Sequence, residues 1–109
     1  MSLEAEYRKE REDIDTMEFE SGFITYRFLP TECYIVDIYV RPEVRRSGYG
    51  SMMANQIKSL ARRHGYHLLT GSVDNRLNSA ITSTEILTRY GFKKLRDEGP
   101  MTYFYLELV

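Results

Sequence analysis

The stretch CYIVDIYVRPEVRRSGYGSMM, residues 33–53, joins an apolar segment to a loop rich in arginine and glycine and to the start of a helical pattern. Its first eight residues are mostly aromatic and β-branched, and Arg41-Pro42 follows, which predicts a β-strand over 33–40. Apolar residues then recur at helical spacing from Gly50 to Gly65. A strand, a glycine loop and a helix in this order predict an anion-binding site, because a helix N-terminus presents free N–H groups.

The side chains of the predicted strand 33–40 alternate between two faces, as in any strand. A regular period of two would place Ile35, Asp37 and Tyr39 on one face. The other face would carry Tyr34, Val36, Ile38 and Val40.

The remaining pattern predicts a mixed α/β (α+β) domain with two helices. Further strands are expected at 17–21, 23–29, 66–73, 92–95 and 102–109. Thr82 and Glu85 fit a capping box that opens a short helix ending at Tyr90, before Gly91. Residues 4–15 are densely charged, so we expect a solvated strand, a frayed helix or a partly disordered terminus there.

Size and composition indicate one globular domain, residues 1–109, with 42% hydrophobic residues. The formal net charge of −1 gives no general attraction to nucleic acid, and no apolar run is long enough to span a membrane. The single Cys33 excludes an internal disulfide and favours a cytoplasmic location. Two histidines and one cysteine are too few for a convincing metal site, so none is expected.

Two common phosphate-binding motifs do not fit the loop RRSGYGS, residues 45–51. A P-loop requires Lys and then Ser or Thr after its second glycine, whereas Ser51 and Met52 follow Gly50. A dinucleotide-binding loop requires a third small residue, and Met53 stands there. The remaining pattern, Arg-x-x-Gly-x-Gly, would bind a diphosphate through glycine N–H groups and arginine side chains.

This pattern resembles the acetyl-coenzyme A binding motif of the GNAT superfamily of N-acetyltransferases. The matching residues are Val40-Arg41-Pro42-Glu43, Arg45, Gly48 and Gly50, followed later by Arg89-Tyr90-Gly91-Phe92 and the next strand. Short GNAT-like proteins of tailed bacteriophages are the most similar, on Gly71-Ser72-Val73 and the Ser/Thr-rich helix start. A phage origin would place the protein in the host cytoplasm.

The resemblance implies a mostly antiparallel, mixed sheet in which a central pair of parallel strands, 33–40 and 66–73, splays apart. The pantetheine arm of acetyl-coenzyme A would lie against Ile38, Tyr39 and Val40. The pyrophosphate would be held by Arg45, Arg46, Ser47, Gly48, Tyr49, Gly50 and Ser51.

The resemblance also implies direct acetyl transfer to an amine, which requires a base and benefits from an acid. Asp37 is the candidate base, although an exposed or ion-paired strand residue would look the same. Many family members carry a tyrosine acid where this chain has Leu87, which leaves Ser83 and Thr84 as weak candidates. Cys33 has no activating neighbour in the sequence, so a nucleophilic role is not expected.

Typical family members begin with a strand and two helices that wall off the acceptor site, and too few residues precede Met17 for that unit. The acceptor site is therefore expected to be open or completed by a second subunit. A homodimer is the favoured hypothesis, with the terminal strand 102–109 as an edge that could pair.

Three functions are compatible with these residues. The first is an acetyl-coenzyme A dependent N-acetyltransferase with an unknown amine acceptor. The second is a coenzyme A-binding or structural module of the same fold without turnover. A nucleic-acid binder is the least favoured, because its candidate arginines flank the loop or end a helix; they are Arg41, Arg45, Arg46, Arg62 and Arg63.

Overall fold

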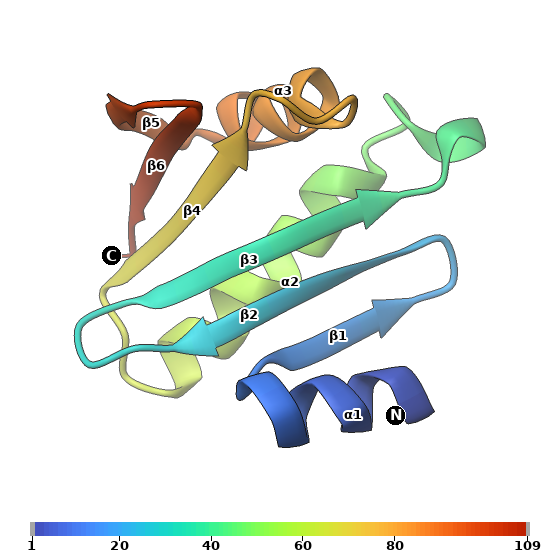
Figure 1. The fold of residues 1–109 in the computed structure, drawn as a ribbon, viewed down its shortest axis with the longest axis vertical. Coiled ribbons are helices and arrows are strands. Elements are labelled where there is room, and N and C mark those ends of the chain that lie inside the picture. Colours follow the sequence, from blue (N-terminus) through green and yellow to red (C-terminus); the bar gives the residue numbers. More distant parts are fainter. Residues whose placement is uncertain (1, 109) are drawn as a thin grey trace.

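The computed structural model describes residues 2–108 as one six-stranded sheet with three α-helices and a short 3₁₀ helix (Figure 1). None of the described helices is both long and apolar enough to cross a membrane. In chain order the elements are α1 (Leu3–Glu12), β1 (Asp15–Phe19), β2 (Gly22–Phe28), β3 (Cys33–Val40), η1 (Pro42–Val44), α2 (Tyr49–Arg63), β4 (Leu68–Asp74), α3 (Ala80–Tyr90), β5 (Lys93–Glu98) and β6 (Met101–Glu107).

The strands are arranged in the order β1-β2-β3-β4-β6-β5. Neighbouring strands run antiparallel except for β3 and β4, which are parallel. Their pairing covers Cys33–Ile35 against Leu69–Gly71 and then stops, so the C-terminal halves of the two strands diverge. The predicted mixed sheet with a central splayed parallel pair is therefore confirmed.

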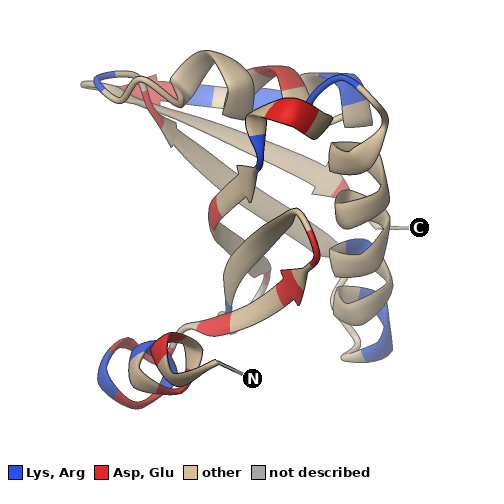
Figure 2. Ribbon diagram, turned by 90° about the vertical axis from the view of Figure 1, so that its right-hand side faces the viewer, with Lys and Arg blue, Asp and Glu red and all other residues tan. Residues whose placement is uncertain are grey.

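The two faces of the sheet are covered differently. α2 and α3 contribute Met53, Ile57 and Leu87 to the main core, together with buried strand residues such as Ile24 and Leu69. α1 lies on the opposite side of the sheet, beside β1 (Figure 2). We call this side the front face, and most of it carries no helix (Figure 1).

The charged N-terminal segment forms the regular helix α1, so the expectations of a strand or a disordered terminus there were wrong. The Ser2 side chain accepts a hydrogen bond from Ala5 N, which caps the helix start. Asp13 ends the helix in a left-handed conformation with φ 56°. Ala5 is buried against the front face, so a third helix adds to the two that were predicted.

A β-bulge changes the predicted faces of β3. Thr25 pairs with Asp37 but Tyr26 pairs with Ile35, so Val36 is an extra residue in the ladder. The bulge reverses the alternation: Ile35 is buried in the main core, whereas Asp37 is exposed. The prediction that these two residues share a face was therefore wrong, because a regular period of two cannot anticipate a bulge.

The helix α3 begins at Ala80, before the predicted capping box. Ser83 N donates to the carbonyl of the cap residue Ser79, so Thr82 and Glu85 both lie inside the helix. The capping-box prediction was wrong because hydrogen bonds to the upstream backbone extend the helix by a turn.

The terminal strand is internal to the sheet. β6 is bonded to β4 on one side and to β5 on the other, so its backbone groups are already paired. The expectation that this strand offers a free edge was wrong; the edge strands are β1 and β5.

Candidate functional site

A cavity of about 370 Å³, the outer cleft, separates the RRSGYGS loop from α3. One wall comes from the end of β3, the loop and the first turn of α2. The opposite wall is a stripe of α3. The lining residues are Val40, Pro42, Arg45, Arg46, Gly48, Gly50, Ser51, Ile81, Thr82, Glu85, Ile86 and Arg89. The outer cleft therefore brings together two segments that lie far apart in the sequence.

The N-terminus of α2 opens into the outer cleft. Its cap residue Gly48 has φ 88° and supplies no side-chain hydrogen bond. The first bond back along the helix runs from Met52 N to Gly48 O, so the N–H groups of Gly50 and Ser51 precede the helical ladder. These groups and the helix dipole favour an anion at this point.

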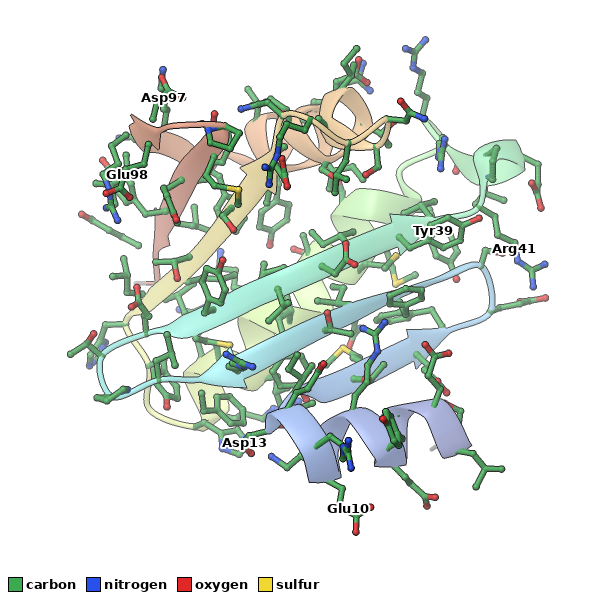
Figure 3. The ribbon with its side chains drawn as sticks, in the orientation of Figure 1. Glu10, Asp13, Tyr39, Arg41, Asp97 and Glu98 are labelled. Carbon is green, nitrogen blue, oxygen red and sulfur yellow. The ribbon has the colours of Figure 1, made fainter. Side chains whose placement is uncertain are left out.

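Arg45 anchors the loop to the end of β3. Its Nε donates to Val40 O at 2.9 Å, and its guanidinium lies 6.0 Å from the centre of the Tyr39 ring. Figure 3 shows Tyr39 at the C-terminal end of β3, with Arg41 projecting away from the fold beyond it. Arg45 keeps a fixed orientation beside the cleft, and its remaining N–H groups can bind a phosphate.

Arg46 and Glu85 link the two walls. Arg46 Nη2 lies 3.7 Å from Glu85 Oε1, and both side chains are partly exposed. Arg46 has a positive φ of 64°, which is uncommon for a residue with a Cβ. An anion in the outer cleft would compete with Glu85 for this arginine.

Gly50 allows α2 to pack closely against α3. A Cβ built there would lie 3.3 Å from Cγ1 and Cγ2 of Ile86, so a side chain would push against α3. The absence of a side chain lets α2 and α3 approach closely and sets the width of the cleft.

The structure places six of the predicted coenzyme-binding residues on the outer cleft: Val40, Arg45, Arg46, Gly48, Gly50 and Ser51. Ile38 lies in a second cavity. Three others do not line the cleft: Tyr39 stacks on Phe23, Ser47 Oγ donates to Val44 O, and Tyr49 Oη accepts from Ser21 N at 2.9 Å. The sequence analysis did not predict that α3 forms the opposite wall of the cleft. The available signal was the spacing of Ile81, Glu85 and Arg89, which recur every four residues and so lie on one side of a helix.

The second cavity, the inner cleft, is a space of about 30 Å³ where β3 and β4 diverge. Its lining residues are Ile35, Val36, Asp37, Ile38, Gly71, Ser72, Ser83 and Leu87. Both clefts lie between the C-terminal half of β3 and α3. The inner cleft brings the two predicted catalytic candidates Asp37 and Ser83 to one place, whereas Thr84 lines neither cleft.

The Asp37 carboxylate is positioned by its own strand. Ile38 N donates to Asp37 Oδ1 at 3.1 Å. Although Asp37 is exposed, the surrounding protein displaces part of the water around its carboxylate, and this desolvation raises its pKa above the usual range. The Ile38 N–H and the positive charge of Arg8 partly oppose this effect. A carboxylate with a raised pKa is a better proton acceptor than an ordinary aspartate.

The other side chains near the inner cleft offer little acid chemistry. Leu87, at the position where the resemblance implied a tyrosine acid, is buried and apolar. Tyr90 points toward α2, and its hydroxyl donates to Asn55 Oδ1. Tyr34 and Ser72 hydroxyls bond to each other across β3 and β4. Ser83 is therefore the α3 residue whose hydroxyl lies at the inner cleft, where an acid would be needed.

Cys33 is fully buried in the main core, and burial raises the pKa of its thiol to about 12. A thiol that stays protonated and inaccessible cannot act as a nucleophile at neutral pH. This agrees with the sequence-based expectation.

The chain is similar to a known protein family. The model of the Acetyltransferase (GNAT) family matches residues 21–82, more than half of the chain, which includes β3, the loop and α2. Among curated protein sequences, none matches closely enough to be identified as a relative.

Several solved structures share the fold. A protein described as a GNAT-family acetyltransferase from Desulfovibrio desulfuricans has 19% sequence identity and a TM-score of 0.70, over 85% of this chain and 66% of its own. A Bacillus subtilis acetyltransferase in complex with coenzyme A has 17% identity and a TM-score of 0.70, over 95% and 84%. The PaiA N-acetyltransferase from Thermoplasma acidophilum, also with coenzyme A, has 14% identity and a TM-score of 0.75, over 96% and 68%.

At these identities the likeness shows the fold alone, and the chain spans just under two thirds of the first structure's length. The family match covers the loop side of the outer cleft but not Glu85, Ile86 and Arg89 on its α3 wall. The chain therefore belongs to the Acetyltransferase (GNAT) family.

Proposed function

We propose that the protein is an acetyl-coenzyme A dependent N-acetyltransferase that transfers the acetyl group directly to an amine. The observation that carries the proposal is the outer cleft, where the open N-terminus of α2 and two arginines face α3 beside the splayed strands. This cleft fits a diphosphate, because it combines backbone donors, a helix dipole and guanidinium groups.

Each part of the cleft has a role in this proposal. The N–H groups of Gly50 and Ser51, with Arg45 and Arg46, would bind the pyrophosphate. The unpaired edge of β3 beyond Ile35 would provide backbone hydrogen bonds to the pantetheine arm. Acetyl-coenzyme A supplies a thioester carbonyl to which the amine nitrogen bonds as the carbon–sulfur bond breaks.

Asp37 is the proposed base. Its carboxylate lies at the inner cleft and would accept the proton that the amine loses. The departing thiolate would be protonated by Ser83 or by water, since Leu87 provides no proton.

Calorimetric titration with acetyl-coenzyme A tests the proposed site in the wild type and in Ser51→Glu. A glutamate in the first turn of α2 is favourable for helix stability but repels an anion. Ser59→Glu, in the same helix and outside the outer cleft, is the matched control. Binding that Ser51→Glu loses and Ser59→Glu keeps supports the proposal; equal binding by all three proteins contradicts it.

A coenzyme A-binding module without turnover is the second candidate, favoured by the buried Leu87 in place of an acid. The two functions differ in thiol release from acetyl-coenzyme A with an amine present. Release that disappears in Asp37→Asn, with coenzyme binding retained, supports the enzyme. Binding with only background release across amines and peptides supports the module.

The homodimer and the bacteriophage origin stay predictions. With β6 internal, any pairing between sheets would have to use β1 or β5. Sedimentation of a strict monomer at high micromolar concentration would contradict the dimer.

A further inference from the structure

A third cavity, the front groove, lies between α1 and the hairpin of β1 and β2 on the front face. It has a volume of about 40 Å³ and shares no lining residue with the outer or inner cleft. Its lining residues are Ser2, Glu4, Ala5, Arg8, Thr16, Glu18, Phe23 and Thr25. Among these described residues, Arg8 is the one basic side chain.

The side chain of Arg8 is held on the sheet side of α1. Ala5, three residues earlier, is 3% exposed against the front face, and residues three apart lie on one side of a helix. Within the described helix α1, Arg8 is the one charged residue that is not exposed, with 32% of its side-chain surface accessible. The packing of α1 on the sheet therefore fixes this guanidinium in the front groove.

The floor of the front groove screens charges weakly. Thr25, which is 1% exposed, and its cross-strand partner Thr16 each have a buried Oγ1 without a hydrogen-bond partner among residues 2–108. Phe23 adds an aromatic ring to the same lining. Where the protein excludes water, the effective dielectric constant is lower than in bulk solvent, so a charge acts over a longer distance.

The proposed base lies beside this floor. Asp37 is the register partner of Thr25, so both side chains are on the front face. In the described part of the chain Arg8 forms its ion pair with Glu4, at 3.5 Å, and not with Asp37. Desolvation raises the pKa of Asp37, and the Ile38 N–H and the positive charge of Arg8 oppose this rise. Arg8 therefore acts on the carboxylate through space rather than by direct contact.

Few other charged groups surround Asp37. Glu4 on α1 and Glu18 on β1 line the front groove, but both are exposed, so water and salt screen them. Arg27, further along β2, does not line the groove and donates from Nη2 to a backbone carbonyl at the C-terminal end of α1. The polar groups on the side of β3, β4 and α3 are uncharged hydroxyls, those of Tyr34, Ser72 and Ser83.

We propose that Arg8 is a positioning residue for acetyl transfer, which acts through Asp37 by stabilising the ionised carboxylate across the front groove. This inference rests on the proposed function, in which Asp37 is the base. A protonated carboxyl cannot accept a proton, and Arg8 offsets the desolvation that favours this form. Arg8 forms no bond itself: the amine nitrogen bonds to the acetyl carbon, the carbon–sulfur bond breaks, and the amine proton passes by way of Asp37 and solvent to the thiolate.

An NMR titration of the Asp37 side-chain carboxyl in isotope-labelled protein tests the interaction without requiring turnover. Arg8→Met removes the charge and keeps an unbranched side chain of high helix propensity, so the carboxyl should lose its proton at a higher pH than in the wild type. Arg8→Lys keeps the charge and should restore most of the wild-type titration. Arg11→Met is the matched control, because Arg11 lies in the same helix, over the Tyr7 ring and outside the groove.

Glu4→Gln separates the effect of charge from that of helix stability. Arg8→Met and Glu4→Gln both break the same ion pair, so a purely structural effect would be shared by the two variants. Their electrostatic effects are opposite, because Glu4→Gln leaves the charge of Arg8 without its carboxylate partner. In this variant Asp37 should therefore lose its proton at a lower pH than in the wild type.

The pH-rate profile of acetyl transfer should follow the carboxyl titration. On the acid side of the profile, Arg8→Met should be about two- to fivefold slower than the wild type, since fewer molecules carry an ionised base. At alkaline pH the two rates should agree within about twofold, because the carboxylate is ionised in both. The KM for acetyl-coenzyme A should not change, because Arg8 lies outside the outer cleft.

An Asp37 titration that is the same in Arg8→Met and the wild type overturns the proposal. Shifts of equal size in Arg8→Met and Arg11→Met, or in the same direction in Arg8→Met and Glu4→Gln, also overturn it. A pH-rate profile that stays unchanged while the carboxyl titration shifts does so too, since Arg8 would then act on a carboxylate that is not the base. Failure of the proposed function is a separate result, in which acetyl-coenzyme A does not bind or no amine is acetylated, whatever the carboxyl titration shows.

Discussion

Arg46 and Glu85 face each other across the outer cleft, with Arg46 Nη2 3.7 Å from Glu85 Oε1. The pair joins the loop before α2 to the middle of α3, and it places a carboxylate in a cleft suited to an anion. An exposed pair of this kind contributes about 0–1 kcal/mol, so its cost to stability is small. Its effect on an anionic ligand is unfavourable in two ways, through repulsion and through competition for Arg46.

Glu85→Gln should therefore bind acetyl-coenzyme A more tightly, by about two- to fivefold, with the gain reduced at high salt. Calorimetry at two ionic strengths measures this effect. Glu98→Gln, which removes a carboxylate from the exposed pair with Arg96 on β5, is the control and should leave affinity unchanged. Weaker binding by Glu85→Gln would mean that the ion pair organises the loop for the ligand.

Asp37 is expected to control the pH dependence of transfer. Because desolvation raises the pKa of Asp37 above 3.8, the carboxylate loses its proton at a higher pH than an ordinary aspartate does. The rate should therefore rise as pH increases through this raised pKa, and Asp37→Asn should lose most of the activity at every pH. A pH-rate profile of the same shape in Asp37→Asn would exclude Asp37 as the base.

The stability of the protein should respond to Asp37 and Asp74 in opposite directions. A folded-state pKa above 3.8 contributes stability that is fully present below pH 3.8 and is lost as the pH rises through the raised pKa. Asp37→Asn should therefore keep or raise the melting temperature at pH 7. Hydrogen bonds from Arg76 lower the pKa of the half-buried Asp74 to about 2. The stability that this gives is present above pH 3.8 and is lost as the pH falls toward 2. Asp74→Asn should therefore lower the melting temperature at pH 7, if only slightly; equal shifts would contradict this assignment.

At Gly48 the backbone conformation alone is expected to determine the cost of a substitution. Its φ is 88°, and no atom lies within 4 Å of the Cβ that a substitution would add. Gly48→Ala should cost about 1–2 kcal/mol of unfolding free energy, and Gly48→Asn less, because asparagine tolerates the left-handed region. Urea denaturation measures both; equal costs would point to a cause other than φ.

Cys33 should behave as a core residue. With no exposed surface and a thiol pKa of about 12, it should resist a disulfide reagent at pH 8 and react fully in denaturant. Cys33→Ala should keep acetyl transfer. Rapid labelling of the folded protein would show that the main core opens readily.

Local patterns in the sequence determined most of the secondary structure. β3 has the predicted bounds, and the helix after the glycine loop and the terminal hairpin lie within a few residues of those predicted. β-branched runs, apolar periodicity and turn residues allow this because they act between near neighbours. The loop Arg45–Ser51 was also predicted as the anion site, since strand, glycines and helix start are consecutive in the chain.

Only the tertiary structure decided how distant segments meet. The bulge at Val36, the contact of Gly50 with Ile86 and the α3 wall with Glu85 and Arg89 depend on pairing and packing between residues far apart in the chain. Sequence determined most of the elements because residue propensity and apolar periodicity act between near neighbours. The clefts depend on strand register and helix approach, which are set by the packing of the whole chain.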